Sequence, residues 1–189
     1  MGDLFYVKSL VLVVVLSFAL YQDIREGRIK NIITLPAALA GIIINTLDSG
    51  AGGLLLSVRG WVVPVLVLIF FYRINAMGAG DIKLFAAAGA LMGLHFAACS
   101  FIFSVGIGGA AALLQLLKRG IFLEKMGGVL AYFIFMAAAG TVVKYDGGAD
   151  GRSRFIFSLA IVPGTLAQLF IEALKASGVT VYEGWFVWF

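Results

Sequence analysis

The feature that most constrains the fold of this chain is a succession of long apolar runs, separated by short polar or basic stretches. Of the 189 residues, 62% are hydrophobic and only 13% are charged, and the mean hydropathy is +1.05. A soluble domain is closer to half apolar and a quarter charged. Runs of about 17 to 25 apolar residues are long enough to cross a bilayer as helices. The sequence therefore predicts an all-α fold, a polytopic membrane helix bundle.

Six of the apolar runs are predicted to cross the membrane, and one further run has two possible assignments. The six runs cover residues 4–21, 32–47, 54–72, 81–93, 95–117 and 155–174. A tight, glycine-rich turn is expected over residues 48–53, between the second and third runs. The further run, residues 126–143, has basic residues beyond both of its ends, namely Lys118, Arg119, Lys125, Lys144, Arg152 and Arg154. If it crossed, one basic cluster would lie outside, against the positive-inside tendency. We therefore expect a re-entrant or interfacial helix on the cytoplasmic side, with seven spans as the alternative.

The chain is expected to form a single membrane-embedded domain over residues 1–175, followed by an aromatic tail over residues 176–189. The first run is expected to be a retained span, because no small-x-small cleavage pattern stands near its end. The tail ends in Trp185-Phe186-Val187-Trp188-Phe189, which is typical of the membrane–water interface. The net charge of +4 lies in short clusters between the runs. Such clusters orient a membrane protein, so they indicate a lipid bilayer as partner and no nucleic acid.

Two aspartates stand where apolar runs meet polar loops. Asp81 begins the fourth run, in the stretch Gly78-Ala79-Gly80-Asp81-Ile82-Lys83, and Asp23 follows the first run. Ionisable groups at such positions are costly in lipid and are candidates for a functional site. Two complete crossings separate the aspartates, so both are predicted at the same membrane face. That face is expected to be cytoplasmic, because its loops carry most of the basic residues: Arg25, Arg28, Lys30, Arg73, Lys83, Lys118 and Arg119.

Two carboxylates at one depth have a defined chemistry if they meet. Within about 3–6 Å of each other they cannot both ionise easily, and they share a proton. The ionised partner can then take a proton from water while the protonated partner polarises a carbonyl, which is general acid–base hydrolysis of a peptide bond. Gly78 and Gly80 are expected to let the backbone bend and a substrate approach. The simpler alternatives are a helix N-cap for Asp81 and a solvated surface charge for Asp23.

These residues resemble those of a known family. Gly78-Ala79-Gly80-Asp81 resembles the GxGD motif of intramembrane aspartyl proteases. Together with Asp23, Arg25, Ile29 and Asn31 after the first run, and with Val162-Pro163-Gly164 near the end, the chain is similar to type IV prepilin peptidases from residue 4 to residue 174.

The resemblance implies a membrane endopeptidase of the cell (inner) membrane that removes the basic leader of prepilin or pseudopilin-like proteins at the cytoplasmic face. It implies that Asp23 and Asp81 are the catalytic pair and that Gly78 and Gly80 shape the site. Lys30 stands where the family often has proline. Larger members carry an insertion with CxxC motifs and also methylate the product, whereas this chain has only Cys99. A short form, without metal or cofactor and without the methyltransferase, is therefore expected, similar to peptidases of tight-adherence (Flp-type) pili or to archaeal preflagellin peptidases.

Two further residues are candidate substrate contacts. Glu26 is a candidate for receiving the basic leader, and Lys83 is either an interfacial anchor or a contact for a substrate carboxylate. His95 is expected at the turn opposite the site, in an interfacial role. Two other functions stay open, a proton-coupled transporter that uses both aspartates and a non-catalytic pilus assembly factor. The oligomeric state is open as well.

Overall fold

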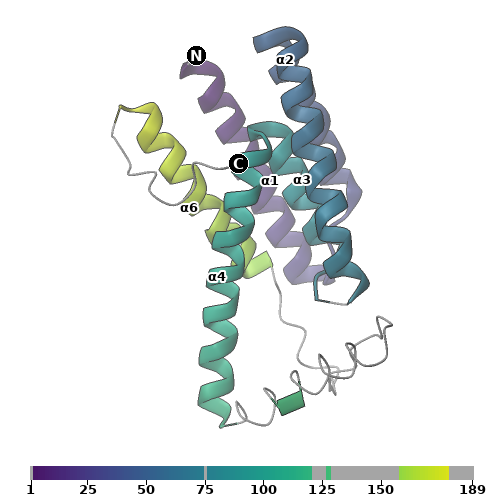
Figure 1. Cartoon of the computed structure of the whole chain (residues 1–189), viewed down its shortest axis with the longest axis vertical. Coiled ribbons are helices and arrows are strands. Elements are labelled where there is room, and N and C mark those ends of the chain that lie inside the picture. The colour runs from purple at the N-terminus through teal and green to yellow at the C-terminus, as the bar shows by residue number, and fades with distance from the viewer. Residues whose placement is uncertain (1, 75, 121–126, 129–157, 179–189) are drawn as a thin grey trace.

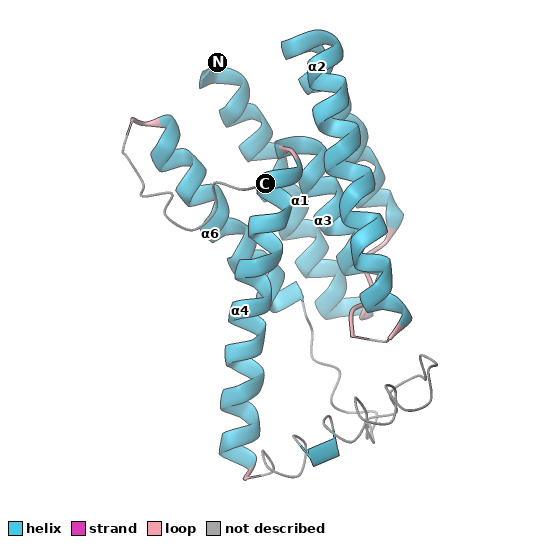
Figure 2. Cartoon of the chain, viewed as in Figure 1, coloured by secondary structure: helices cyan, strands magenta, loops and turns pink. Residues whose placement is uncertain are grey.

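The computed structural model describes residues 2–74, 76–120, 127–128 and 158–178, which form helices joined by short turns. The helices are α1 (Gly2–Glu26), α2 (Asn31–Arg73), α3 (Ala79–Met92), α4 (Leu94–Arg119) and α6 (Ser158–Ala176) (Figure 1). No strand occurs in these described ranges (Figure 2). The expected all-α fold is confirmed for this part of the chain.

Four of the described helices, α1, α2, α4 and α6, are long and apolar enough to cross a membrane. They indicate a multi-pass membrane protein. The helix α3 has 14 residues, and at about 1.5 Å per residue it is shorter than a hydrocarbon core of about 30 Å. The six predicted crossings therefore stay a prediction. The run 126–143 lies outside the described residues apart from 127–128, and so does the tail beyond residue 178.

The 43-residue helix α2 contains two of the predicted runs and reverses between them. Its regular geometry breaks at Ser49 (φ −133°) and Gly50 (φ 58°), and the positive φ favours glycine. Beyond the break, the Ser57 hydroxyl donates to the carbonyl of Gly41 at 3.2 Å. In a straight helix, residues with this separation of 16 positions would lie about 24 Å apart. The two halves therefore pack against each other, and the predicted turn over residues 48–53 is confirmed.

The short helix α3 lies in the interior of the bundle, in contact with α1, α2 and α4 (Figure 1). Small residues allow this. A Cβ at Gly41 would lie 2.6 Å from the backbone of Ala90, and a Cβ at Gly60 would collide with the carbonyl of Gly89. Each half of α2 thus approaches α3 backbone to backbone, as small residues permit between membrane helices. All but one of the α3 residues from Asp81 to Leu91 are buried, so α3 is the core of the fold.

A buried asparagine closes the end of α3 that is remote from Asp81. The side-chain amide of Asn45 donates to the carbonyls of Ala90 and Leu91, at 3.0 and 3.1 Å, and to the hydroxyl of Ser57 at 2.8 Å. The last carbonyls of a helix have no partner within the helix, so Asn45 satisfies two of them. Its own carbonyl accepts from Lys8 of α1 at 2.9 Å. This network ties α1 and both halves of α2 to α3, and the sequence analysis did not single out Asn45.

The helices α4 and α6 pack closely at Gly164, where a Cβ would meet the backbone and hydroxyl of Ser104. The Val162-Pro163-Gly164 stretch therefore lies at a helix contact. One turn earlier on α4, the ring of Phe101 packs edge-on against Phe85, with 5.5 Å between the ring centroids. These contacts fix α4 between α3 and α6.

Candidate active site

Asp81 lies in the first turn of α3 with its carboxylate turned back to the helix start. Gly78 is the residue before the helix, and its N–H donates to Oδ2 of Asp81 at 3.2 Å. The aspartate therefore stabilises the helix terminus from the third helical position. The simpler interpretation of Asp81 as a capping residue is thus partly correct, but the bond occupies only one carboxylate oxygen. The other oxygen stays available for chemistry.

The surroundings of Asp81 favour its protonated form. The side chain is buried, with 8% of the residue exposed, and it lies outside the four membrane-length helices. The pKa of Asp81 is raised from its ordinary value of 3.8 to about 6. Burial is the largest cause, the hydrogen bond from the Gly78 N–H lowers this pKa, and the negative charge of Asp23 raises it. The carboxylates of Asp23 and Asp81 are therefore close enough to interact electrostatically.

Asp23 lies in the last turn of α1, where its side chain is half-buried. The helix ends because Gly27 adopts a φ of 64° and donates its N–H to the carbonyl of Asp23 at 2.8 Å. This is the left-handed termination that glycine makes readily. After it the chain turns back, and Ile29 is buried against the bundle with 6% of the residue exposed.

The two motif glycines have specific steric roles. A Cβ at Gly80 would lie 3.0 Å from the Cβ of Ile29 and 3.2 Å from its backbone nitrogen. Glycine at 80 therefore lets the start of α3 pack against the loop that follows Asp23. A Cβ at Gly78 would lie 3.1 Å from Oδ2 of Asp81. Because Gly78 has an ordinary φ of −75°, the backbone bend expected there does not require glycine, and its missing side chain leaves room beside the carboxylate.

The two charged candidates for substrate contacts differ in their surroundings. Glu26, at the end of α1, is exposed and forms an ion pair with Lys30, with 2.8 Å between Nζ and the carboxylate oxygens. The backbone N–H of Lys30 also donates to the side chain of Gln22 at 3.1 Å. These two interactions of Lys30 hold the loop between α1 and α2 against the end of α1. Lys83 is exposed although its neighbours on α3 are buried. Its side chain therefore lies on a different face of α3 from Asp81.

Ile29 was noted in the sequence as part of the motif, but its packing against Gly80 was not predicted. The signal available was an isolated apolar residue in a basic loop. Among the described residues, no group of three or more His, Cys, Asp or Glu side chains is placed to hold a metal ion. The geometry therefore provides a buried carboxyl, a second carboxylate whose charge raises the pKa of the first, and a glycine at position 78 that leaves this carboxyl uncrowded.

Comparison with known proteins decides the family. The sequence profile of the type IV leader peptidase family matches residues 10–114, which include both aspartates and both motif glycines. The chain belongs to the type IV leader peptidase family. The expected relationship is thereby confirmed for more than half of the chain.

Members of the type IV leader peptidase family include a curated relative from Bacillus subtilis (strain 168), the prepilin leader peptidase/N-methyltransferase. The chain is 38% identical to it over 119 residues, which cover 59% of this chain and 47% of the relative. The chain thus spans about half the length of that relative. No solved structure matches the chain.

Proposed function

We propose that this chain is an aspartic endopeptidase that removes the basic leader of prepilin-like proteins at the cytoplasmic face of the cell membrane. The observation that carries the proposal is the buried carboxyl of Asp81, whose pKa is raised to about 6. The negative charge of Asp23 is one cause of this rise. Membership of the leader peptidase family supports the same activity. The relative's name includes prepilin cleavage and N-methylation, and we propose only the cleavage for this chain.

In the proposed reaction, one carboxylate of the pair is ionised and the other is protonated. The ionised carboxylate takes a proton from a water molecule, whose oxygen attacks the carbonyl carbon of the scissile peptide. The protonated carboxyl donates its proton to the carbonyl oxygen, so a neutral tetrahedral diol forms. When the C–N bond breaks, the protonated carboxyl of the pair gives a proton to the leaving amine, and the ionised carboxylate takes the proton of one diol hydroxyl, whose oxygen becomes the carbonyl oxygen of the product. The pair shares its protons, so neither Asp23 nor Asp81 has a fixed role as acid or base.

The proposed substrate enters beside Gly78, whose missing side chain leaves the Asp81 carboxylate uncrowded, while Gly80 holds the start of α3 against Ile29. The 3.1 Å that separates a Cβ at position 78 from the carboxylate supports a role for Gly78 in admitting the substrate backbone. We propose that Glu26 receives a basic side chain of the leader, which then replaces Lys30 as its partner. Lys83 lies on another face, so we propose it as an interfacial anchor or as a contact for a substrate carboxylate outside the reacting centre.

The proposed orientation follows from the crossings. If the two halves of α2 supply two crossings, Asp23 at the end of α1 and Asp81 at the start of α3 lie at one membrane face. The concentration of basic residues in the loops of that face supports a cytoplasmic position. Both carboxylates lie at helix ends, which supports a peptidase over a proton-coupled transporter, since transporters bind near the bilayer midplane.

The test is cleavage of a prepilin-like substrate in liposomes by the wild type, Asp23→Asn and Asp81→Asn. Asparagine keeps the side-chain volume, and at position 81 its carbonyl can still accept from Gly78, so the helix start is preserved. The matched control is Asp48→Asn, which changes a carboxylate at the Asn45 end of the bundle. We expect each of the first two variants to lose cleavage and the control to retain it.

Three outcomes contradict the proposal. Near-normal cleavage by either Asp23→Asn or Asp81→Asn would exclude the paired mechanism. A folded wild type that cleaves no prepilin-like leader but moves protons across the liposome would favour the transporter. If it does neither, a non-catalytic assembly factor is favoured.

A further inference from the structure

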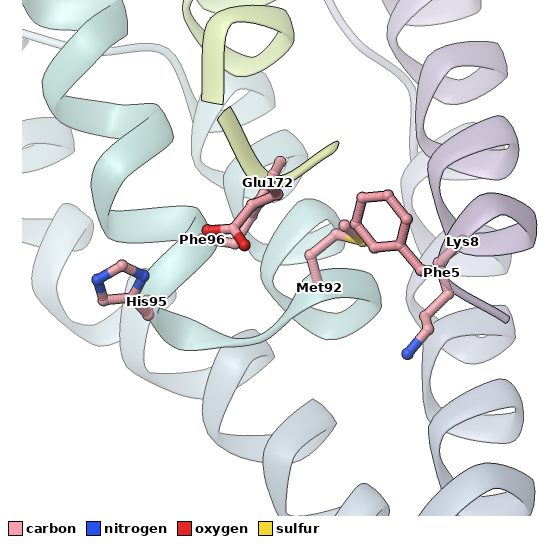
Figure 3. Close-up of a pocket in the computed structure, with 6 residues that line it drawn as sticks. All are labelled: Phe5, Lys8, Met92, His95, Phe96 and Glu172. Atoms are coloured by element: carbon pink, nitrogen blue, oxygen red, sulfur yellow. The ribbon is translucent and has the colours of Figure 1, made fainter. Parts of the chain in front are cut away.

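A second group of ionisable side chains lies at the end of the bundle remote from Asp81. They line a pocket of about 230 Å³, formed by Phe5, Lys8, Met92, His95, Phe96 and Glu172 (Figure 3). The pocket lies at the Asn45 end, because Lys8 donates a hydrogen bond to Asn45. The proposed hydrolysis uses none of these residues.

If α1, α4 and α6 cross the membrane, the pocket lies at the depth of the lipid headgroups. Lys8 is close to the start of α1 at Gly2, His95 is the second residue of α4, and Glu172 is in the last turns of α6. At about 1.5 Å per residue, each lies within about 9 Å of a helix end. The headgroup region extends about 5–8 Å beyond the hydrocarbon core on each side. A ligand of this pocket can therefore reach it from the membrane surface.

The charges of the pocket balance each other. The ammonium of Lys8 lies 3.9 Å from the carboxylate of Asp48. The carboxylate of Glu172 accepts from the amide of Gln168 at 3.0 Å and lies 3.6 Å from the ammonium of Lys175. Both of these partners approach Oε1 of Glu172. A pocket with one cation, one anion and no net charge suits a ligand that is itself zwitterionic.

The remaining walls are apolar. Phe5, Met92 and Phe96 separate the charged groups, and Figure 3 shows Phe5 and Met92 between Lys8 and Glu172. Such a surface suits the glycerol and the first methylenes of an acyl chain. Partial burial strengthens charge-assisted hydrogen bonds, and the side chains of Lys8 and Glu172 are only 16% and 26% exposed.

We propose that this pocket binds the headgroup of a zwitterionic phospholipid with a primary ammonium, of the phosphatidylethanolamine class. The lipid ammonium donates to the carboxylate of Glu172, and the lipid phosphate accepts from Lys8. The glycerol lies against Phe5 and Met92. A quaternary ammonium has no N–H to donate, so phosphatidylcholine loses the bond to Glu172.

The experiment measures which lipids stay on the purified protein. Full-length protein is reconstituted in vesicles of equal phosphatidylethanolamine, phosphatidylcholine and phosphatidylglycerol, extracted in mild detergent, and its retained lipids are counted by mass spectrometry. One charge-assisted hydrogen bond corresponds to a preference of about tenfold or more for phosphatidylethanolamine over phosphatidylcholine. Successive N-methylation of the ethanolamine should weaken retention stepwise.

Matched variants locate the preference. Glu172→Gln should reduce it to nearly equal retention, whereas Glu26→Gln, the same change at the opposite end, should leave it intact. Excess inorganic phosphate should not displace the lipid, because it lacks the ammonium and the acyl chain.

Three results would overturn the proposal: retention by the wild type in proportion to vesicle composition, a preference for phosphatidylglycerol, or an unchanged preference in Glu172→Gln. The wild-type comparison of the three lipids decides the matter even if Glu172→Gln does not fold.

Discussion

Replacing Asp23 by asparagine should lower the pKa of Asp81, and this change tests the proposed pair without any substrate. Two influences raise the pKa of Asp81, first burial and then the charge of Asp23. The substitution removes the second influence and leaves the first. We therefore expect the pKa of Asp81 in Asp23→Asn to lie between its ordinary value of 3.8 and the value of about 6 in the wild type.

The magnitude follows from the size of the rise. A change from 3.8 to about 6 corresponds to about 3 kcal/mol against ionisation of Asp81. Burial contributes more to this free energy than Asp23 does, since it is the largest cause. The wild-type carboxyl is half protonated near pH 6, so a carboxylic acid is present close to neutral pH, as the proposed reaction requires.

The assay is infrared titration of the protein in lipid nanodiscs, which follows the C=O stretch of protonated carboxyls. The band that Asp81→Asn removes belongs to Asp81. Its midpoint should fall in Asp23→Asn and stay near 6 in the control Asp48→Asn. An unchanged or higher midpoint in Asp23→Asn would mean that the two carboxylates do not interact, and the pair would have to be abandoned.

Three further predictions concern stability. Gly60→Ala should prevent tight packing of α2 on α3, because the new Cβ collides with the carbonyl of Gly89. The melting temperature of this variant should fall far more than that of the control Gly52→Ala, whose Cβ meets nothing within 4 Å. Asn45→Leu removes the hydrogen bonds from the side-chain amide to Ala90, Leu91 and Ser57. The free energy of unfolding should fall by about 2 kcal/mol, at about 0.6 kcal/mol for each bond in a membrane protein. Unfolding by denaturant measures this change, and an unchanged midpoint would contradict the role of Asn45. The pKa of Asp81 in the folded protein is above its ordinary value of 3.8, so the protonated side chain stabilises the fold below a pH of about 4. This contribution of up to about 3 kcal/mol is lost as the pH rises through about 6, and the free energy of unfolding of the wild type should fall over that range. An equal fall in Asp81→Asn would exclude Asp81 as the source.

Several features were readable from local sequence because short-range physics determines them. The apolar runs predicted helices and membrane crossing, since backbone groups in lipid must pair within their own segment. The reversal in α2 was predicted from a glycine-rich turn, and it occurs at Ser49 and Gly50. Asp81 was expected at the start of a helix and lies in the first turn of α3. The whole motif pointed to the family that the comparison confirmed.

Other features depended on which segments pack together. The packing of Gly80 on Ile29 and the hydrogen bonds from Asn45 to the last carbonyls of α3 join segments that are far apart in the chain, so the structure was needed to find them. A glycine that permits close helix packing and a glycine that forms a turn look alike in the sequence. Only the segment that packs against the glycine in the folded protein distinguishes the two roles. The pocket between Lys8, His95 and Glu172 likewise joins residues far apart in the chain.

The sequence by itself determined the class of the protein, because hydropathy and helix geometry act within single segments of the chain. It also determined where the two aspartates stand relative to their helices. Only the tertiary structure decided that Asp81 is buried and that the charge of Asp23 reaches it. The physical reason is that burial and electrostatic coupling depend on distances between segments, and the packing of α3 against α1 and the two halves of α2 determines those distances.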